Sequence, residues 1–341
     1  MQRLIAEMNW KPRPSWGRKI WARAVVSCAV FVLSAMGLSA IAQETSTLLV
    51  LRPQPKGIAS DRIKTVTTGQ GANVVPSIIS SQVSEIKIGG KPATIAAWTP
   101  LLNGPTNLQL IVLFDSQLRI GLGTQFDEIK ALFHTLPSNV EIAVGVMLQG
   151  KAVIKQPFTT DRTLAGNALH LPTMEDSMNP TNVSRGLSCL HDLAIHWPDP
   201  DPKKVRAVLL FTGGGGGVPS IDLERAGIAP FAVFYINLDL EKDGVTYTPD
   251  AMSRSVGYVG QDNLDFLAKL TNGEALYYPH QITTTFTPLL YKFYTILSSE
   301  AVVTVTVKGS GLQPLDIKSS SNEIKIVGPD QVMIGNELLA K

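Results

Sequence analysis

Residues 108–114 read LQLIVLF, and this stretch decides the fold because it is wholly apolar after Gln109. A strand with one face in water alternates apolar and polar residues, whereas a continuous apolar run is typical of a strand buried on both faces. Two later runs, Val140–Leu148 and Val205–Phe211, have the same character. We therefore expect three central strands in a sheet that is covered by helices on both faces.

The segments between these runs have a helical apolar period or the pattern of further strands. Helices are expected at Thr124–Leu136 (with Thr124 as its cap), Thr181–Trp197, Ile221–Gly227, Asp262–Leu270 and Thr283–Leu297, the last beginning or bending near Pro288, and strands at Pro230–Ile236 and Ala275–Tyr278. Gln149-Gly150 turns the chain into Lys151–Phe158, which predicts an antiparallel hairpin at the sheet edge. Asp161–Pro180 is expected to be an irregular connection. The predicted class is α/β, with a doubly wound, mostly parallel, Rossmann-like sheet and one antiparallel edge strand.

The flanks of this α/β region have β character instead. Val83–Ile88 alternates, Gly89-Gly90-Lys91-Pro92 turns the chain, and Ala93–Trp98 is expected to return as the partner strand. After Ser299, strands are expected at Val302–Lys308, Glu323–Val327 and Gln331–Ile334. We hypothesise that residues 43–105 and 299–341 pair into one small β-rich module, from which an α/β domain at residues 106–298 emerges.

The N-terminus predicts export. Arg13, Arg18, Lys19 and Arg23 precede an uncharged run that ends in Ala40-Ile41-Ala42, which fits a secretory signal peptide cleaved after Ala42. The alternative is an uncleaved membrane anchor, because the run is about as long as a membrane-spanning helix. Cleavage would leave a periplasmic or secreted chain with no stable membrane insertion.

Charge and cysteine content limit the classes of partner. The chain has 30 Lys or Arg and 28 Asp or Glu, and residues 1–42 hold six and one of these, so the remainder has a net charge of −3. A nucleic-acid-binding surface is not supported. Cys189 is the one cysteine after residue 42, and its apolar helical surroundings predict a buried, unreactive thiol.

Three loops are the candidate binding site. Ligands of open α/β sheets bind beyond the carboxyl ends of the strands, where this chain has the loops Asp115–Gly123, Asn179–Ser184 and Thr212–Ser220. The candidate binding residues in them are Asp115, Ser116, Thr181, Asn182, Thr212, Gly213 and Gly214.

These loops resemble the metal-site loops of von Willebrand factor type A domains. Phe114-Asp115-Ser116, Asn179-Pro180-Thr181-Asn182 and Leu209–Gly214 have the family's order and spacing over residues 107–297, and the predicted hairpin at Val140–Phe158 lies where the family has one. The resemblance implies a metal site with Asp115 and Thr181 among its ligands. The family's two first-loop serines fall on Gln117 and Arg119, and its third-loop aspartate falls on Gly213.

A degenerate metal site follows from these differences. Mg²⁺ requires near-octahedral oxygen ligands, and one carboxylate and one hydroxyl beside Arg119 are a poor set. We therefore expect no cofactor, with a Mg²⁺-dependent adhesion module as the alternative. The segment Glu85–Ile95 also resembles the β segment that precedes such domains in secreted acidobacterial proteins.

Enzyme chemistry is not indicated by the remaining motifs. The glycine run Gly213–Gly217 lacks the lysine of a phosphate-binding loop. Ser188 lacks the second glycine of a nucleophile elbow, and no His-Glu-x-x-His occurs. His191 and His196 are expected to be solvated or capping residues, and Asp161, Asp176 and Asp199 are expected to be simply solvated. The sequence thus predicts an exported, non-catalytic module that binds a protein of the cell envelope or the extracellular space, with an unrecognised enzyme as a further alternative.

Overall fold

The structure of the 341-residue chain is a computed structural model. It describes residues 44–55, 80–115, 125–148, 150–170, 186–212, 231–237, 264–276 and 285–335. None of the helices within these ranges is long and apolar enough to span a bilayer.

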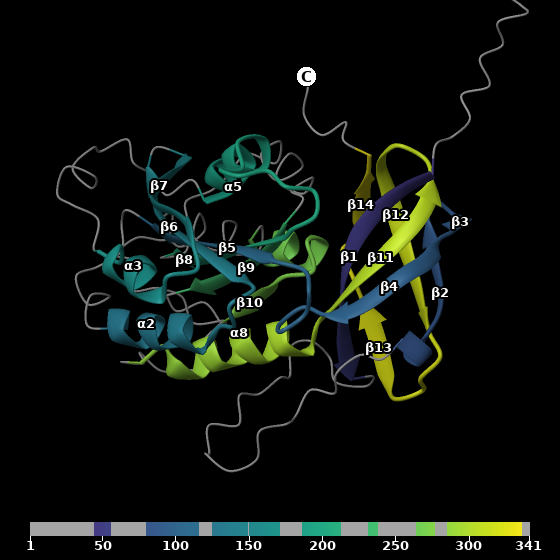
Figure 1. The fold of residues 1–341 in the computed structure, drawn as a ribbon, viewed down its shortest axis with the longest axis horizontal. Helices are drawn as coiled ribbons and strands as arrows, with labels where there is room; N and C mark the ends of the chain where they lie inside the picture. The colour runs from purple at the N-terminus through teal and green to yellow at the C-terminus, as the bar shows by residue number, and fades with distance from the viewer. Residues whose placement is uncertain are drawn as a thin grey trace, which may run out of the picture. The chain divides into compact units, whose positions relative to one another are not determined.

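A six-stranded mixed sheet holds the three apolar runs side by side (Figure 1). Its strand order is β10-β9-β8-β5-β6-β7, in which every neighbouring pair is parallel except β6 and β7. The strands are β5 (Leu108–Asp115), β6 (Val140–Leu148), β7 (Lys151–Thr159), β8 (Val205–Thr212), β9 (Ala232–Asn237) and β10 (Glu274–Leu276). The α/β class is confirmed, and the antiparallel β7 lies at the edge of the sheet.

Burial on both faces explains the continuous apolar sequence of β5. Successive side chains of a strand point to opposite faces, and Val112 and Phe114 pack in one core cluster while Ile111 and Leu113 pack in another. Helices α2 (Phe126–Thr135), α3 (Arg162–Asn167) and α8 (Thr287–Ser299) contribute to the first cluster. Helix α5 (Gly186–Ile195) and the helix at residues 264–270 contribute to the second. Figure 1 shows α2 and α8 on one side of the sheet and α5 on the other.

Helix α2 differs from the sequence prediction in its cap, and helix α3 was not predicted. Helix α2 begins after Gln125, which makes no side-chain capping bond, and the expected cap Thr124 lies outside the described residues. The connection after Asp161 was expected to be irregular, but it begins with α3. Asp161 caps this helix by accepting hydrogen bonds from the backbone N–H groups of Thr163 and Leu164, at 2.9 and 3.0 Å. The predicted helix at 221–227 lies outside the described residues.

Strands before and after the α/β region pair with one another in two four-stranded sheets. Their orders are β13-β1-β11-β4 and β14-β12-β2-β3. The strands are β1 (Glu44–Pro55), β2 (Val83–Ile88), β3 (Lys91–Pro92), β4 (Thr94–Pro100), β11 (Ala301–Lys308), β12 (Gly311–Ser319), β13 (Ile324–Val327) and β14 (Gln331–Ile334), and a 3-10 turn, η2 (Ser80–Gln82), precedes β2. Leu49, Ile88 and Val305 share one core cluster, so the two sheets pack against each other.

The sequence predicted that Ala93–Trp98 pairs with β2 in a hairpin, and this prediction is wrong. Gly89 and Gly90 turn the chain with φ of 58° and 75°, a region that glycine occupies without strain. After this turn, the returning chain pairs with β2 over Lys91–Pro92 alone, and β4 pairs with β11 of the other sheet. Pro92 has no N–H with which to continue the ladder, and the chain passes to the second sheet there. Strand β12, which pairs with β2, was not predicted.

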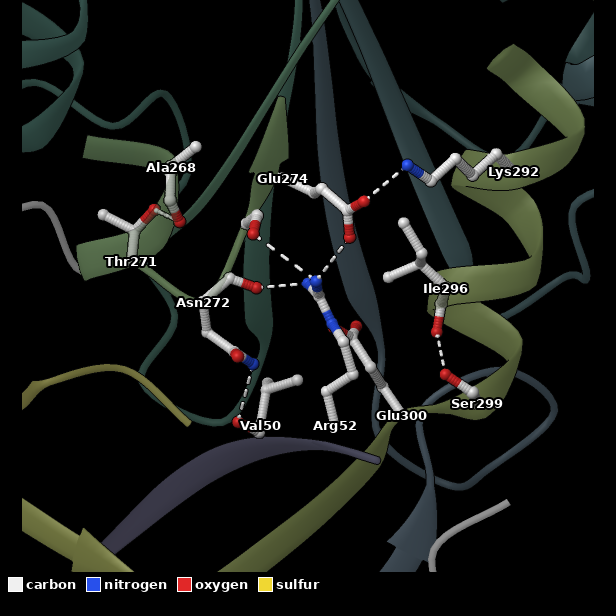
Figure 2. A network of polar contacts seen from close by, with 11 residues as sticks. Val50, Arg52, Ala268, Thr271, Asn272, Glu274, Lys292, Ile296, Ser299 and Glu300 are labelled. Atoms are coloured by element: carbon white, nitrogen blue, oxygen red, sulfur yellow. Dashed lines mark hydrogen bonds and ion pairs between the residues drawn. The ribbon is translucent and has the colours of Figure 1, made fainter. Parts of the chain in front are cut away.

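Arg52, near the end of β1, joins these sheets to the α/β region (Figure 2). Its Nε lies 3.0 Å from Oε1 of Glu300, and its Nη1 lies 3.1 Å from Oε2 of Glu274 in β10. Its Nη1 and Nη2 also donate to the backbone carbonyls of Gly273 and Asn272. One guanidinium thus binds two carboxylates and two carbonyls.

A second cation completes this junction. Lys292 of α8 lies 2.6 Å from Oε1 of Glu274, on the side of the carboxylate away from Arg52 (Figure 2). The amide of Asn272 donates to the carbonyl of Val50 in β1 at 3.1 Å. Glu300 follows the last turn of α8 and precedes β11, and its side chain is 1% exposed. The junction therefore has as many cations as carboxylates.

Candidate functional site

Two of the predicted binding residues meet at the carboxyl edge of the six-stranded sheet. Strands β5 and β8 are parallel neighbours in register, with Phe114 opposite Phe211, so the residues that end them lie side by side. Thr212 Oγ1 donates a hydrogen bond to Asp115 Oδ2 at 3.1 Å. Asp115 is 2% and Thr212 is 1% exposed. The edge thus carries a buried carboxylate that a hydroxyl from the adjacent strand holds in place.

Aromatic side chains pack together next to this pair, at the ends of β5 and β8. The rings of Phe114 and Phe211 stack with centroids 4.9 Å apart, and Phe126 of α2 meets Phe114 edge-on at 5.7 Å. Phe286, at the start of α8, packs on Phe211 at 5.4 Å. Aromatic pairs at such distances are favourable beyond their area burial. The ends of β5 and β8 are therefore held by a group of four closely packed aromatic rings.

Cys189 of α5 lies near this edge but is chemically quiet. The thiol is fully buried, and burial raises its pKa well above the ordinary value, with Asp192 and Asp115 adding to the effect through their negative charge. Because the thiolate is the nucleophilic form, Cys189 is a packing residue at neutral pH.

The other predicted site residues lie outside the described residues. These are Ser116, Thr181, Asn182, Gly213 and Gly214, and Asp176 and the rest of the glycine run also belong to this group. The structure thus brings together Asp115 and Thr212 of the seven candidates.

Within the described residues, this edge has two side chains that could offer oxygen ligands to a metal ion. The described residues supply one carboxylate, Asp115, and one hydroxyl, which already donates to that carboxylate. No group of three or more His, Cys, Asp or Glu that could hold a metal occurs within the described part of the chain. In the sequence, Gln117, Arg119 and Gly213 stand where the resembled family has oxygen ligands. Mg²⁺ takes near-octahedral oxygen ligands, and Thr181, the other predicted ligand, lies outside the described residues.

Sequence reasoning missed a polar cluster at the opposite, amino edge of the sheet. Gln109 of β5 is fully buried; its carbonyl accepts from Trp197 Nε1 at 2.8 Å, and its amide donates to Asp199 Oδ2 at 3.1 Å. Lys204 Nζ lies 2.9 Å from Glu141 Oε2 and 3.3 Å from Asp199 Oδ2. Asp199, expected to be simply solvated, is thus bonded on both sides. The signal was Gln109 itself, a polar residue in an otherwise apolar strand.

The two histidines of α5 have different surroundings. His196 is exposed, and its Nδ1 lies 3.2 Å from Asp192 Oδ1. His191 differs from the solvated residue that was expected, because its Nδ1 is buried and has no hydrogen-bond partner in the described structure. No serine or cysteine nucleophile is hydrogen-bonded to either ring among the described residues.

Comparison with known proteins gives structural neighbours only. No protein-family model matches the chain, and no curated protein matches it. Similar solved structures include the conserved hypothetical protein BatB from Bacteroides thetaiotaomicron (16% identity, 51% of this chain and 92% of that chain, TM-score 0.37). They also include the ArnB paralog VWA2 from Sulfolobus acidocaldarius (10% identity, 84% and 76% coverage, TM-score 0.36) and proximal thread matrix protein 1 of the mussel byssus (14% identity, 56% and 47% coverage, TM-score 0.36). At these values the likeness says nothing about what this chain binds.

Proposed function

We propose that this chain is an exported, non-catalytic binding module whose partner-binding surface lies at the carboxyl edge of the six-stranded sheet. The observation that carries the proposal is the buried Asp115–Thr212 pair, which joins the ends of two adjacent parallel strands. This is the edge at which open α/β sheets bind their ligands. Asp115 and Thr212 are the first residues of the segments Asp115–Gly123 and Thr212–Ser220, to which we assign the contact with a partner.

The proposed fold is a doubly wound domain of the von Willebrand factor type A kind with a degenerate metal site. The strand order, the antiparallel β7 and the helices on both faces of the sheet favour this assignment. The partner is a protein of the cell envelope or the extracellular space, because the N-terminal 42 residues have the pattern of a secretory signal and the remainder has a net charge of −3.

The binding is proposed to be independent of metal. A hydroxyl of the protein already donates to Oδ2 of Asp115, and a carboxylate oxygen bonded in this way competes poorly for an ion with strict geometry. Calorimetric titration of the chain with Mg²⁺ and Mn²⁺ tests this point. We expect no binding tighter than about millimolar, and tight binding that disappears in Asp115→Asn would favour the metal-dependent alternative.

Partner binding is tested with two variants at the carboxyl edge of the sheet and one control variant away from it. The wild-type chain, Asp115→Asn and Thr212→Val are immobilised and used to capture proteins from the envelope fraction of the producing cells, with quantification by mass spectrometry. Asp161→Asn is the matched control, because it makes the same chemical change at the cap of α3 and retains a capping side chain. Thermal unfolding confirms that each variant is folded.

We expect a captured protein whose recovery falls at least about tenfold, or about 1.4 kcal/mol, in Asp115→Asn and Thr212→Val, because both variants alter the bond between these two residues. Its recovery should be unchanged in Asp161→Asn. Equal recovery with folded wild-type and folded edge variants contradicts the proposal. The same holds if the wild-type chain enriches no protein over the edge variants.

A further inference from the structure

A cavity of about 600 Å³ lies at the amino edge of the six-stranded sheet, away from the Asp115–Thr212 pair. The first residues of β8 and β9 form one wall, together with the end of α5, and β1 and β14 form the opposite wall. Its volume lies within the range of small-molecule sites, roughly 300 to 1,000 Å³. The space is therefore large enough for a ligand of moderate size.

Apolar side chains line much of this cavity. Leu48 and Val50 come from β1, Met333 comes from β14, and Ile195, Trp197 and Phe231 come from the α/β region. Trp197 and Phe231 are buried and pack against each other at 5.1 Å. Ile195 is 42% exposed. Such a lining favours the hydrocarbon portion of a ligand.

Arg206 of β8 brings a positive charge to the same cavity. Its guanidinium lies 5.5 Å from the ring centroid of Trp197, which orients it. It is half-buried, and within the described part of the chain it makes no hydrogen bond or ion pair. Lys204, which also lines the cavity, is instead bonded to Glu141 and Asp199.

The electrostatics around Arg206 leave a place for an anion. Burial lowers the pKa of Arg206 from its ordinary value, and the negative charges of Asp201, which also lines the cavity, and of Asp199 oppose this effect. Asp201 accepts from the backbone N–H of Lys203, and Asp199 accepts from Gln109 and Lys204. A planar guanidinium can bind a carboxylate through two parallel hydrogen bonds. A ligand carboxylate would supply the partner that the protein does not.

We propose that this cavity binds an amphipathic carboxylate, with its carboxylate on Arg206 and its apolar body against Trp197, Phe231 and the residues of β1. This binding site is separate from the carboxyl edge, and it does not depend on the function proposed for that edge. The observation on which it rests is that Arg206 stacks on Trp197 without an ion-pair partner among the described residues and lines the cavity beside apolar side chains.

Calorimetry with three eight-carbon probes tests the charge preference. Octanoate, octanol and octylammonium have the same chain and differ in the head group. We expect octanoate to bind the full chain at least about tenfold more tightly than octanol, as a charge-assisted hydrogen bond to arginine requires, and octylammonium to bind more weakly still. No octanoate binding, or equal affinities for the three probes, overturns the proposal.

Three variants locate the site. Arg206→Gln should reduce octanoate affinity to that of octanol, whereas Lys203→Gln, an exposed neighbour that does not line the cavity, should leave it unchanged. Ile195→Glu changes an exposed lining residue, so it tests the site without disturbing the core, and its negative charge should weaken octanoate binding at least about tenfold. Unchanged octanoate affinity in a folded Arg206→Gln chain, or in Ile195→Glu, refutes the assignment.

Discussion

The ionisation of the Glu300 side chain depends strongly on its place in the fold. Burial raises its pKa to about 7, while the charge and hydrogen bond of Arg52 act to lower it and the charge of Glu274 raises it further. This folded-state value lies above the ordinary 4.5, so the folded state binds the proton more tightly than the unfolded chain. The stabilisation from this group is complete below the ordinary pKa and is lost as pH rises through about 7.

Glu300→Gln should remove this part of the pH dependence. We expect the free energy of unfolding of the wild-type chain to fall between about pH 5 and about pH 8 by more than that of the variant, by an amount on the order of a few kcal/mol. Urea denaturation at a series of pH values measures both slopes, and Glu323→Gln at an exposed position is the control. Parallel slopes for the wild-type and Glu300→Gln chains would contradict the raised pKa.

Individual site residues could be predicted from the sequence where strand order alone decides their position. Asp115 and Thr212 each follow an apolar run, and parallel neighbouring strands bring such residues to one edge. The pairing of Arg52 with Glu300 had no such signal. These residues lie 248 positions apart, and no local pattern links them.

Elements were predictable where one strong pattern covers their whole length. The prediction for β6 has the observed bounds, and those for β5 and β8 end one residue early, because continuous apolar runs have few competing interpretations. Strand β12 was missed because it contains Pro314, which disfavours a strand in the sequence pattern, and because its alternating side chains are only partly buried. Helix α3 was missed because six residues are too few to establish a helical period.

The cap of α3 gives a prediction at this scale. Asp161 accepts hydrogen bonds from two backbone N–H groups in the first turn, and loss of a capping side chain costs about 1 kcal/mol. Asp161→Ala should lower the free energy of unfolding by that amount in urea denaturation, and Asp161→Asn should recover most of it. Asp316→Ala, at an exposed strand position, should change it by less than about 0.5 kcal/mol. Equal stabilities of Asp161→Ala and Asp161→Asn would show that the cap contributes nothing.

In the molecule as a whole, strands from the two flanks meet around a core of their own. The only reason in the sequence to expect this arrangement was that both β segments lie near an end of the chain. In the structure, β1 pairs antiparallel with β11. The partner of β4 could not be predicted, because a turn followed by an apolar strand indicates a hairpin whether or not the strand changes sheets. Sheet membership depends on packing between distant segments, which local patterns do not report.

The Arg52 junction should couple the stability of these sheets to that of the α/β region. Arg52→Met removes the cation and leaves the buried carboxylate of Glu300 and the carbonyl of Asn272 without this donor. Breaking a buried ion pair from one side costs about 3–5 kcal/mol, whereas replacing both partners with apolar residues is often close to neutral. We therefore expect a loss of about 3–5 kcal/mol in Arg52→Met, and partial recovery in Arg52→Met with Glu300→Leu. Lys318→Met, which breaks the exposed pair with Glu85, should cost much less than Arg52→Met, because solvent screens an exposed ion pair. Urea denaturation measures the free energy of unfolding of all three variants.

Hydrogen exchange shows where in the molecule backbone protection is lost. If the junction couples the two parts, Arg52→Met lowers protection in β11 and in β9 alike. A loss confined to β1, or a cost no larger than that of Lys318→Met, would mean that each part is stable without the other.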